Sequence, residues 1–546
     1  MYDTEASMLR TNLYLWLNWI EHRSSEPGVG GSSPSRYTKL AVNLVRTGTE
    51  SDKKCFNKPM KKSIPKEVLD VVSGLKTKGF EAYLVGGCVR DLILGRAPND
   101  WDITTNAHPE EIQECFEETF YENNFGTVGV KTRSQNPETQ VVEVTPYRTE
   151  STYSDNRRPD SVSFAKTLSE DLSRRDFTIN ALAYNPDKDE IIDEFGGKED
   201  LTNKSISTVG NADERFQEDA LRILRAIRFA AQLDFGVSQE TLCAISTNKN
   251  LLDSVSRERI GEEFAKIIKT SSPSVALGIA EKLNILGIFS NVLREAVGID
   301  QNKQAHLYDV WEHLVRSCQH AADKDFKYEV RLAALFHDIG KPPTKRTDKN
   351  GKTSFFGHEV VGARITEKVL KDLKFSRETI KRVVSLVRWH MFFSDTEEIT
   401  LSAVRRLIAN VGKEAIWDLI DLRKCDRIGS GRPKEEPYRL RQFIAMIDEV
   451  LHDPVSVGML KMNGDIMLQE FHMKPGPRIG WMLHALLEEV LEDPQRNTLE
   501  HLSERVRGME GLPDVELRKK GESGIEKRDE IEAGHIKEIK KRRKVA

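Results

Sequence analysis

Several features that mark other classes of protein are scarce or missing in this chain of 546 residues. Its six cysteines include no Cys-x-x-Cys pair and no regular spacing, so the sequence predicts reduced thiols in a cytoplasmic protein rather than a disulfide framework or a zinc site. No apolar run approaches the roughly 18 to 20 residues needed to span a bilayer. Because the net charge is only -4, any surface for nucleic acid must be a local basic patch.

The chain is long enough for several domains, and its patterns predict an α+β protein. Short strands such as "EAYLVGG" and "QVVEVTPYR" alternate with helices in the first half, which predicts a small mixed sheet with acidic residues on adjacent strands. Helical periodicity then dominates to about residue 510, without a convincing strand. We expect an extension at 1–59, a mixed-sheet head at 60–205, a helical neck at 206–300, a second helical domain at 301–430, a helical tail at 431–510 and a charged, solvated tail at 511–546.

The first 59 residues differ from everything that follows them. The segment Gly31-Ser32-Ser33-Pro34 can be encoded by GGT-TCG-AGT-CC, which matches the T-arm of a tRNA gene. One hypothesis is that this extension reads across an upstream tRNA gene and that translation starts at Met60. The alternative is an ordinary disordered extension. The genomic nucleotide sequence decides between the two.

Asp100 and Asp102 stand two residues apart in the segment "DWDITT", which we interpret as a strand. Residues i and i+2 of a strand point to the same side, so both carboxylates face one pocket. Glu143, in the strand "VVEVTPYR", is the candidate for a third acid from a neighbouring strand. Oxygen ligands suit Mg²⁺, and three such acids predict a two-metal site.

Gly86 and Gly87 follow a buried strand, and Arg90 comes three residues later. Glycines allow the backbone to approach a polyphosphate closely, and an arginine can clamp its oxygens. A glycine turn or an Asp-x-Asp pair alone is also typical of an ordinary strand, turn and helix. Together with the acids, these residues predict a nucleotidyl-transfer site.

The segment "EDALRILRAIR" predicts a helix with a polar stripe beside apolar positions. The stripe consists of Asp219, Arg222, Arg225 and Arg228, which recur every three residues. Such a stripe is usually a solvated helix face, so the pattern by itself leaves its role open.

Four motifs carry a family resemblance: "LVGGCVRDLILGRAPNDWDITT", "RRPDSVSFAKTLSEDLSRRDFTINALAY", "DEFGGKEDLTNKSISTVGNADERFQEDALRILRAIRFAAQLDF" and "SRERIGEEFAKII". Together they resemble the bacterial class II CCA-adding tRNA nucleotidyltransferases and the related bacterial poly(A) polymerases, over roughly residues 64 to 300. The resemblance implies a head with a nucleotidyltransferase fold of the polymerase-β type, followed by a helical neck that recognises the base.

The resemblance also implies roles for individual residues. Asp100 and Asp102 are similar to the family's metal-binding carboxylates. The positions that resemble nucleotide-binding residues are Gly86, Gly87 and Arg90 for the triphosphate, Arg175, Asp176 and Asn180 for the triphosphate and ribose, Asp219 and Arg222 as the template that reads the base, and Arg225 and Arg228 as further nucleotide contacts. Glu218 completes the family's Glu-Asp-x-x-Arg pattern as a supporting residue, while Arg259 and Glu263 resemble a helix-stabilising i,i+4 motif.

These roles imply template-independent addition of C, C and A to the 3′ end of tRNA, with CTP and ATP as substrates and Mg²⁺ as cofactor. The alternatives are a poly(A) polymerase, an enzyme that adds only part of CCA, a nucleotide-sensing head that regulates the second domain, and an RNA-binding scaffold. The segment "RTESTYSDNRRPD" is similar to the family's flexible loop and favours complete CCA addition. No membrane partner is implied, and the oligomeric state stays open.

A set of histidines and aspartates follows the neck: His313, the pair His337-Asp338, and Asp426. With the core motif "HDIGKP", it resembles the ligand set of HD-type metal phosphohydrolases over about residues 305 to 430. His358 and His390 are similar to the extra histidines of members with a second metal. Imidazole with carboxylate suits Mn²⁺, Ni²⁺, Co²⁺ or Fe²⁺ better than Mg²⁺.

The HD resemblance implies phosphodiesterase or phosphatase activity on 2′,3′-cyclic phosphates or nucleotides, and a degenerate scaffold is the alternative. Lys341 either contacts a phosphate or lies at the surface. Further along, "PGPRIG" is similar to the family's RNA-grasping tail, where Lys474, Arg478 and a helix from about Ile479 meet phosphates. The alternative for this tail is a helical hairpin that caps the preceding domain.

Overall fold

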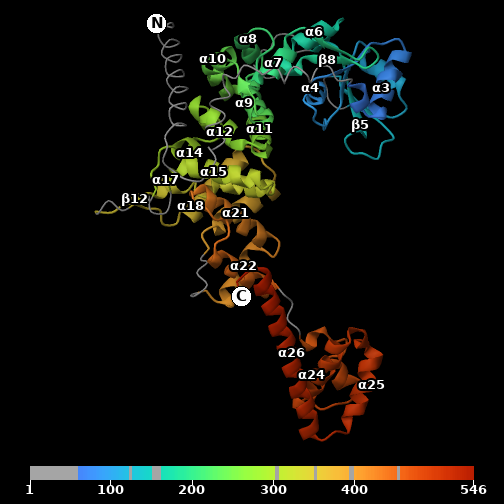
Figure 1. The fold of residues 1–546 in the computed structure, drawn as a ribbon, viewed down its shortest axis with the longest axis vertical. Helices are drawn as coiled ribbons and strands as arrows, with labels where there is room; N and C mark the ends of the chain where they lie inside the picture. Colours follow the sequence, from blue (N-terminus) through green and yellow to red (C-terminus); the bar gives the residue numbers. More distant parts are fainter. Residues whose placement is uncertain are drawn as a thin grey trace. The chain divides into compact units, whose positions relative to one another are not determined.

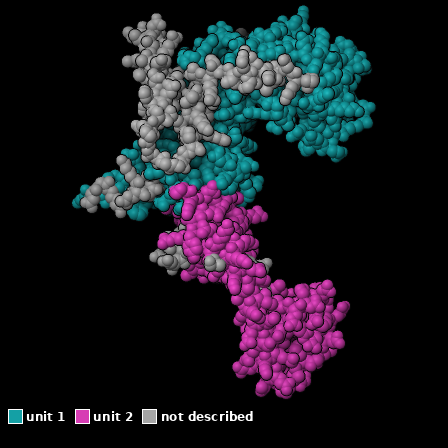
Figure 2. Space-filling view, in the orientation of Figure 1, with its two compact units in different colours: residues 1–388, 425–432 teal, residues 389–424, 433–546 magenta. Residues whose placement is uncertain are grey.

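The structure is a computed structural model, which describes residues 60–121, 126–150, 162–301, 307–349, 353–392, 399–451 and 456–545. The predicted extension at 1–59 and most of the predicted flexible loop lie outside the described residues. The chain forms two compact units, which are residues 1–388 with 425–432 and residues 389–424 with 433–546 (Figure 2).

The head is built on a seven-stranded sheet with the strand order β3-β4-β5-β2-β1-β8-β9. Figure 1 labels β5 and β8 of this sheet. Strands β2 and β5 run parallel, and the other neighbouring pairs of this sheet run antiparallel. The strands are β1 (Ala82–Val85), β2 (Asp102–Thr105), β3 (Thr119–Tyr121), β4 (Val128–Lys131), β5 (Val141–Pro146), β8 (Leu182–Asn185) and β9 (Glu190–Asp193). The predicted mixed sheet is therefore confirmed.

Short helices complete the head: α3 (Lys66–Thr77), α4 (Gly87–Ile93), α5 (Pro109–Cys115), α6 (Leu168–Ser173), the 3-10 turn η3 (Thr178–Asn180) and α7 (Gly197–Asn203). Helix α6 begins with a capping box, in which Thr167 and Glu170 satisfy each other's backbone amides. A separate antiparallel pair, β6 (Arg148–Glu150) and β7 (Val162–Phe164), precedes it.

The neck is helical, but the predicted helix "EDALRILRAIR" is two helices. These are α8 (Ala212–Glu218) and α9 (Leu221–Leu233), and Asp219 between them has an extended backbone with φ -144° and ψ 102°. The other neck helices are α10 (Gln239–Asn248), α11 (Arg257–Lys269), α12 (Pro273–Lys282), α13 (Leu286–Phe289) and α14 (Asn291–Glu295). Because the helix is interrupted there, Asp219 does not belong to the predicted polar stripe of α9. It lies in the corner between α8 and α9.

The expectation of no strand after residue 205 is wrong in two places. Strand β10 (Ser205–Ile206) pairs in parallel with β11 (Gly236–Val237), and β12 (Arg346–Thr347) pairs antiparallel with β13 (Thr353–Ser354). Each strand has only two residues, which is too short for period-two alternation to be visible in the sequence.

The HD region is built from α15 (Val310–Asp323), α16 (Tyr328–Phe336), α17 (Lys341–Thr344), α18 (His358–Asp372), α19 (Arg377–Trp389) and α21 (Ala415–Gly429). Helix α16 is buried from Val330 to Phe336, including Arg331. The buried run places most of this helix in the core, and the run leads directly into His337 and Asp338.

The second unit contains α20 (Leu401–Val411), α22 (Tyr438–Leu451), α23 (Gly464–Gln469), α24 (Pro477–Glu492), α25 (Leu499–Glu510) and α26 (Asp514–Arg542). Its core gathers Met482 and Leu486 of α24, Leu502 and Val506 of α25, and Leu517 of α26. The charged segment at 511–546 is helical over Asp514–Arg542, and Leu517, Gly521 and Gly524 of α26 are buried, while most of its other residues are exposed as expected for a solvated tail.

Two glycines let α26 lie directly against α24. A Cβ on Gly521 would lie 2.7 Å from the Cα of Trp481, and a Cβ on Gly524 would lie 2.0 Å from the carbonyl oxygen of His484. Real side chains do not fit at such distances, so these two positions allow the backbones of the two helices to touch.

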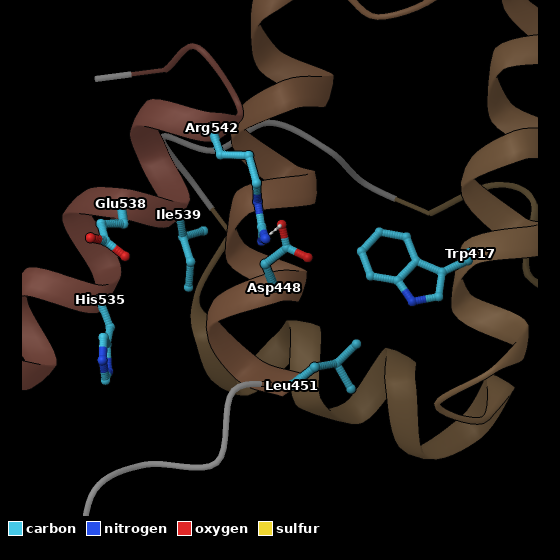
Figure 3. A pocket seen from close by; sticks show the side chains of 7 residues that line it. All are labelled: Trp417, Asp448, Leu451, His535, Glu538, Ile539 and Arg542. Carbon is cyan, nitrogen blue, oxygen red and sulfur yellow. Dashed lines mark hydrogen bonds and ion pairs between the residues drawn. The ribbon is translucent and has the colours of Figure 1, made fainter.

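The C-terminal end of α26 also packs onto α22 and forms one wall of a pocket of about 540 Å³. In Figure 3 the side chain of Arg542 reaches Asp448, and the lining residues are Trp417, Asp448, Leu451, His535, Glu538, Ile539 and Arg542. Arg543 donates to the same carboxylate with its Nε 2.7 Å from Oδ2 of Asp448. These ion pairs fasten the end of the long helix.

None of the helices within the described ranges combines the length and the apolar content that a membrane-spanning segment requires. The five described cysteines are free thiols, as predicted.

Candidate active sites

The acids of the head meet at the start of the parallel strand pair. Asp102 is the first residue of β2 and stands in register with Glu143 of β5. Residues opposite each other on neighbouring strands share a face of the sheet, so the predicted third acid lies beside the second. Asp100 is not on the strand as we expected; it is exposed in the bend directly before β2, while Trp101 is buried.

Gly86 forms the turn between β1 and α4 with a backbone φ of +76°. A Cβ there would be strained, and it would lie 2.9 Å from Nη1 of Arg175 and 3.8 Å from Oδ2 of Asp102. The turn therefore brings the predicted phosphate-binding arginine and a predicted metal-binding acid to one small space. Gly87 begins α4, where a Cβ would lie 3.7 Å from Nη2 of Arg90.

Arg90, Asn180 and Asp176 form a buried chain of hydrogen bonds behind this turn. Nη1 of Arg90 donates to Oδ1 of Asn180 at 2.7 Å, and Nδ2 of Asn180 donates to Oδ1 of Asp176 at 3.1 Å. Nε of Arg225 donates to Oδ2 of Asp176 at 2.7 Å. Burial by itself would raise the pKa of Asp176, but Arg225 and Asn180 lower this pKa to about 2, so the carboxylate stays ionised.

Asp219 and Arg222 lie at the corner between α8 and α9. Nη2 of Arg259, on α11, donates to Oδ2 of Asp219 at 2.7 Å. Arg222 is 7% exposed; it pairs with Glu218 at 2.5 Å and donates to the carbonyl oxygen of Arg174 at 3.1 Å. Both predicted base-reading side chains are thus held by protein groups, and Glu218 supports Arg222 as predicted.

Arg228 and Glu263 show that the neck motifs pair across helices. Nε of Arg228 donates to Oε2 of Glu263 at 2.7 Å, and both residues are buried. Arg259 joins α11 to the corner and Glu263 joins it to α9, so both residues also act between helices; the interpretation of the two as an i,i+4 helix-stabilising motif stays a prediction. Arg228 is tied into the core, whereas Arg225 remains partly exposed.

Sequence reasoning missed one residue of the head, Asp171 on α6. It is fully buried and pairs with both Arg174 and Arg175. The signal that was available is its i,i+4 spacing from Arg175, a residue that the motif "RRDFTINA" had already singled out.

The histidine cluster is brought together in the HD region. Nε2 of His313, on α15, lies 2.9 Å from Nε2 of His337 and 3.1 Å from Oδ2 of Asp338. Asp426, on α21, places Oδ1 3.5 Å from Nε2 of His313 and 3.8 Å from Nε2 of His337. Donor atoms around one metal ion, each about 2.1 Å from it, stand roughly 3 to 3.5 Å apart, so this set fits a bound cation.

Backbone carbonyls orient two of these imidazoles. Nδ1 of His337 lies 2.9 Å from the carbonyl oxygen of Ala334, and Nδ1 of His358 lies 2.8 Å from that of Phe355. A carbonyl only accepts, so Nδ1 carries the hydrogen and Nε2 is directed to the cluster. Nε2 of His358 lies 3.1 Å from Oδ1 of Asp338, on the side of that carboxylate away from His313.

Charges in the cluster favour a cation. Burial by itself would lower the pKa of His337, but Asp338 and Asp426 raise it to about 9, and a metal ion would compete with that proton. Nζ of Lys341 lies 2.6 Å from Oδ2 of Asp338 and the residue is 6% exposed, so the alternative of a surface role for Lys341 is wrong.

His390 is buried directly after α19 in the second unit, and its role as a ligand stays a prediction.

The donor atoms match the predicted classes of metal. Carboxylates alone meet in the head, which suits a hard cation such as Mg²⁺. Imidazole and carboxylate mix in the HD cluster, which suits a transition metal. In this structure, therefore, the residues of both sites fit divalent metals, and the choice of ion remains a prediction.

Three family models match successive parts of the chain. The Poly A polymerase head domain matches residues 82–207, the probable RNA and SrmB-binding site of polymerase A matches residues 234–295, and the HD domain matches residues 304–450. The order of the three models follows the order of head, neck and HD region.

Relatives and solved structures agree with these matches. The CCA-adding enzyme of Enterococcus faecalis is 52% identical over 204 residues, which are 37% of this chain and 49% of that one. The CCA-adding enzyme of Ligilactobacillus salivarius is 34% identical over 435 residues, which are 78% of this chain and 92% of that one.

The structure of the Bacillus stearothermophilus CCA-adding enzyme in complex with CTP superposes with a TM-score of 0.53 and 28% identity, covering 82% of this chain and 98% of that chain. The matched ranges cover the head, the neck and the HD region, and the superposition covers most of the chain. This chain belongs to the family of CCA-adding enzymes, with a nucleotidyltransferase head and an HD domain.

Proposed function

We propose that this protein adds C, C and A to the 3′ end of tRNA, using CTP and ATP without a nucleic-acid template. The observation that carries the proposal is the register of Asp102 with Glu143, beside a turn that only glycine fits and an arginine that faces it. Phosphoryl transfer depends mainly on positioning and charge neutralisation, and this arrangement supports both.

In the proposed reaction the 3′-OH of the RNA attacks the α-phosphate of the nucleotide in line, and pyrophosphate leaves. Asp100, Asp102 and Glu143 would hold Mg²⁺, which supplies charge neutralisation at the reacting phosphate when bound. Arg175, beside the turn at Gly86, orients the triphosphate. Asp176 and Asn180 offer polar contacts to the ribose, for which an RNA-making enzyme needs a partner of the 2′-OH.

The side chains of Asp219 and Arg222, at the corner between α8 and α9, are proposed to recognise the base of the incoming nucleotide. A carboxylate accepts hydrogen bonds and a guanidinium donates them, so the pair can match the edge of cytosine or adenine and reject the other bases. Arg259 and Glu218, which hold the two side chains, then determine how the edge is presented.

The decisive experiment supplies the protein with Mg²⁺ and tRNAs that end before C74, at C74 and at C75, with CTP or ATP separately, and sequences the product ends. We expect CTP to extend the first two substrates and ATP to extend only the third. A tail of repeated A on every substrate would identify a poly(A) polymerase instead, and extension by only one nucleotide class would identify a partial CCA-adding enzyme.

A second function is supported by the HD cluster: metal-dependent hydrolysis of phosphate esters, including 2′,3′-cyclic phosphates. The observation that favours it is the convergence of His313, His337, Asp338 and Asp426. We expect hydrolysis of 2′,3′-cyclic AMP with Mn²⁺, Ni²⁺ or Co²⁺ and its loss in Asp338→Asn. Absence of hydrolysis with each of these metals would leave the cluster only a structural role.

A further inference from the structure

Asp171 is a carboxylate without an assigned role at the back of the head site. Its side chain is fully buried, and each oxygen has two partners. Oδ1 accepts from Nε and Nη2 of Arg174 at 3.0 and 2.6 Å, and Oδ2 lies 3.2 Å from Nη2 of Arg175 and 3.3 Å from Oγ1 of Thr104. Burial alone would raise the pKa of Asp171, but Arg175 and Arg174 lower it, so the buried group stays ionised.

Arg175 uses only part of its guanidinium in this contact. Nη2 donates to Asp171, while Nη1 faces the turn at Gly86, 2.9 Å from the place of a Cβ there. Its Nε is buried and has no hydrogen-bond partner among the residues that the structure describes. A guanidinium has five N–H donors in a fixed plane, so fixing one edge on Asp171 directs the remaining donors.

Thr104 ties the same carboxylate to the acid-bearing strands. Its Oγ1 lies 3.1 Å from the carbonyl oxygen of Thr145 as well as 3.3 Å from Asp171, and its single hydrogen serves one acceptor at a time. Thr104 follows Asp102 by two residues on β2, and Thr145 follows Glu143 by two residues on β5. Asp171 therefore connects Arg175 to the two strands that present the acids.

We propose that Asp171 is a positioning residue for nucleotide binding: it holds Arg175 so that Nη1, beside the Gly86 turn, donates to the triphosphate. This inference rests on the proposed function, since the ligand is a nucleoside triphosphate. The negative charge is essential to the role, because an amide at this place would turn an N–H towards a guanidinium that has only donors to offer.

The test measures CTP and CMP binding to the full chain and to Asp171→Asn, with Mg²⁺ and without RNA. We expect the Kd for CTP to rise about tenfold or more, the loss associated with a charge-assisted hydrogen bond, while the Kd for CMP changes less than twofold. In an Arg175→Ala background, Asp171→Asn should add little, because the arginine that it holds is already missing.

Asp200→Asn is the matched control. Asp200 is a partly buried acid of the same region, and its side chain accepts hydrogen bonds from the hydroxyls of Thr178 and Ser207. We expect this variant to leave both Kd values within twofold of wild type, whatever its effect on thermal stability.

Four outcomes decide the inference. An unchanged Kd for CTP in folded Asp171→Asn overturns it, and so does an equal rise for CTP and CMP, which would mean a general distortion of the site. If Asp171→Asn does not fold, Thr104→Val serves instead, because it removes the hydroxyl that contacts Oδ2 of Asp171. This variant must then raise the Kd for CTP and leave the Kd for CMP unchanged. If Asp171→Asn weakens CTP binding as expected but the wild-type protein does not extend tRNA, the proposed function is contradicted and the role of Asp171 in triphosphate binding stands.

Discussion

Arg259 of α11 holds Asp219 at the corner between α8 and α9, with Nη2 2.7 Å from Oδ2. Forty residues separate the two in the chain, and the pair joins two helices of the neck at the place where the base is proposed to be read. The orientation of the proposed base-reading carboxylate therefore depends on a residue outside the motif that contains it.

Replacing Arg259 by Ala should weaken the choice of nucleotide. Loss of a charge-assisted hydrogen bond costs on the order of 1.5 to 3 kcal/mol, so we expect kcat/KM for CTP and ATP to fall about tenfold or more and the preference over UTP and GTP to shrink. Steady-state kinetics with the four nucleotides measure this. Lys266→Ala, which removes a half-exposed cation of the same helix, is the control and should keep the preference.

Asp100→Ala should abolish nucleotide incorporation while tRNA binding stays within about threefold of wild type, since one lost contact to the metal removes catalysis and not the RNA surface. Incorporation of labelled CTP and a filter-binding assay with tRNA measure the two properties. Asp70→Ala, an exposed aspartate on α3, should behave as wild type. Normal turnover by Asp100→Ala would remove this residue from the proposed metal site.

Asp176 should contribute acid-sensitive stability. Its pKa of about 2 in the folded protein lies below the unfolded value near 3.9, so its contribution is complete above about pH 4 and is lost as the pH falls towards 2. The shift corresponds to roughly 2.6 kcal/mol. Unfolding free energies of wild type and Asp176→Asn should therefore differ at pH 6 and converge near pH 2; a difference that is constant with pH contradicts the assignment.

Gly524→Ala should loosen α26 from α24, because the added Cβ would lie 2.0 Å from the carbonyl oxygen of His484. Hydrogen exchange in peptides of α26 should become faster. Gly534→Ala on the same helix has open space around its Cβ and should instead slow exchange slightly, since Ala favours a helix over Gly by about 0.5 to 1 kcal/mol. Equal behaviour of the two variants would argue against close contact of the helices.

Much of the candidate site was visible in local patterns. Short apolar and alternating segments predicted the strands of the sheet, and the sheet brings Asp102 and Glu143 together as expected. The motif "HDIGKP" follows the buried run at residues 330–336, and its histidine and aspartate lie 2.9 and 3.1 Å from His313, as the family resemblance implied. These predictions succeed because hydrophobic period and turn residues act over a few positions.

The sequence by itself determined which side chains are available: the acids near β2, the glycine turn, the arginines of the neck and the histidines of the HD region. Only the tertiary structure decided their partners, since Arg259 reaches Asp219, Glu263 reaches Arg228, and α26 docks through Gly521 and Gly524. The physical reason is that an ion pair or a helix contact depends on how distant segments pack, whereas a periodic pattern records only which face of each segment is apolar.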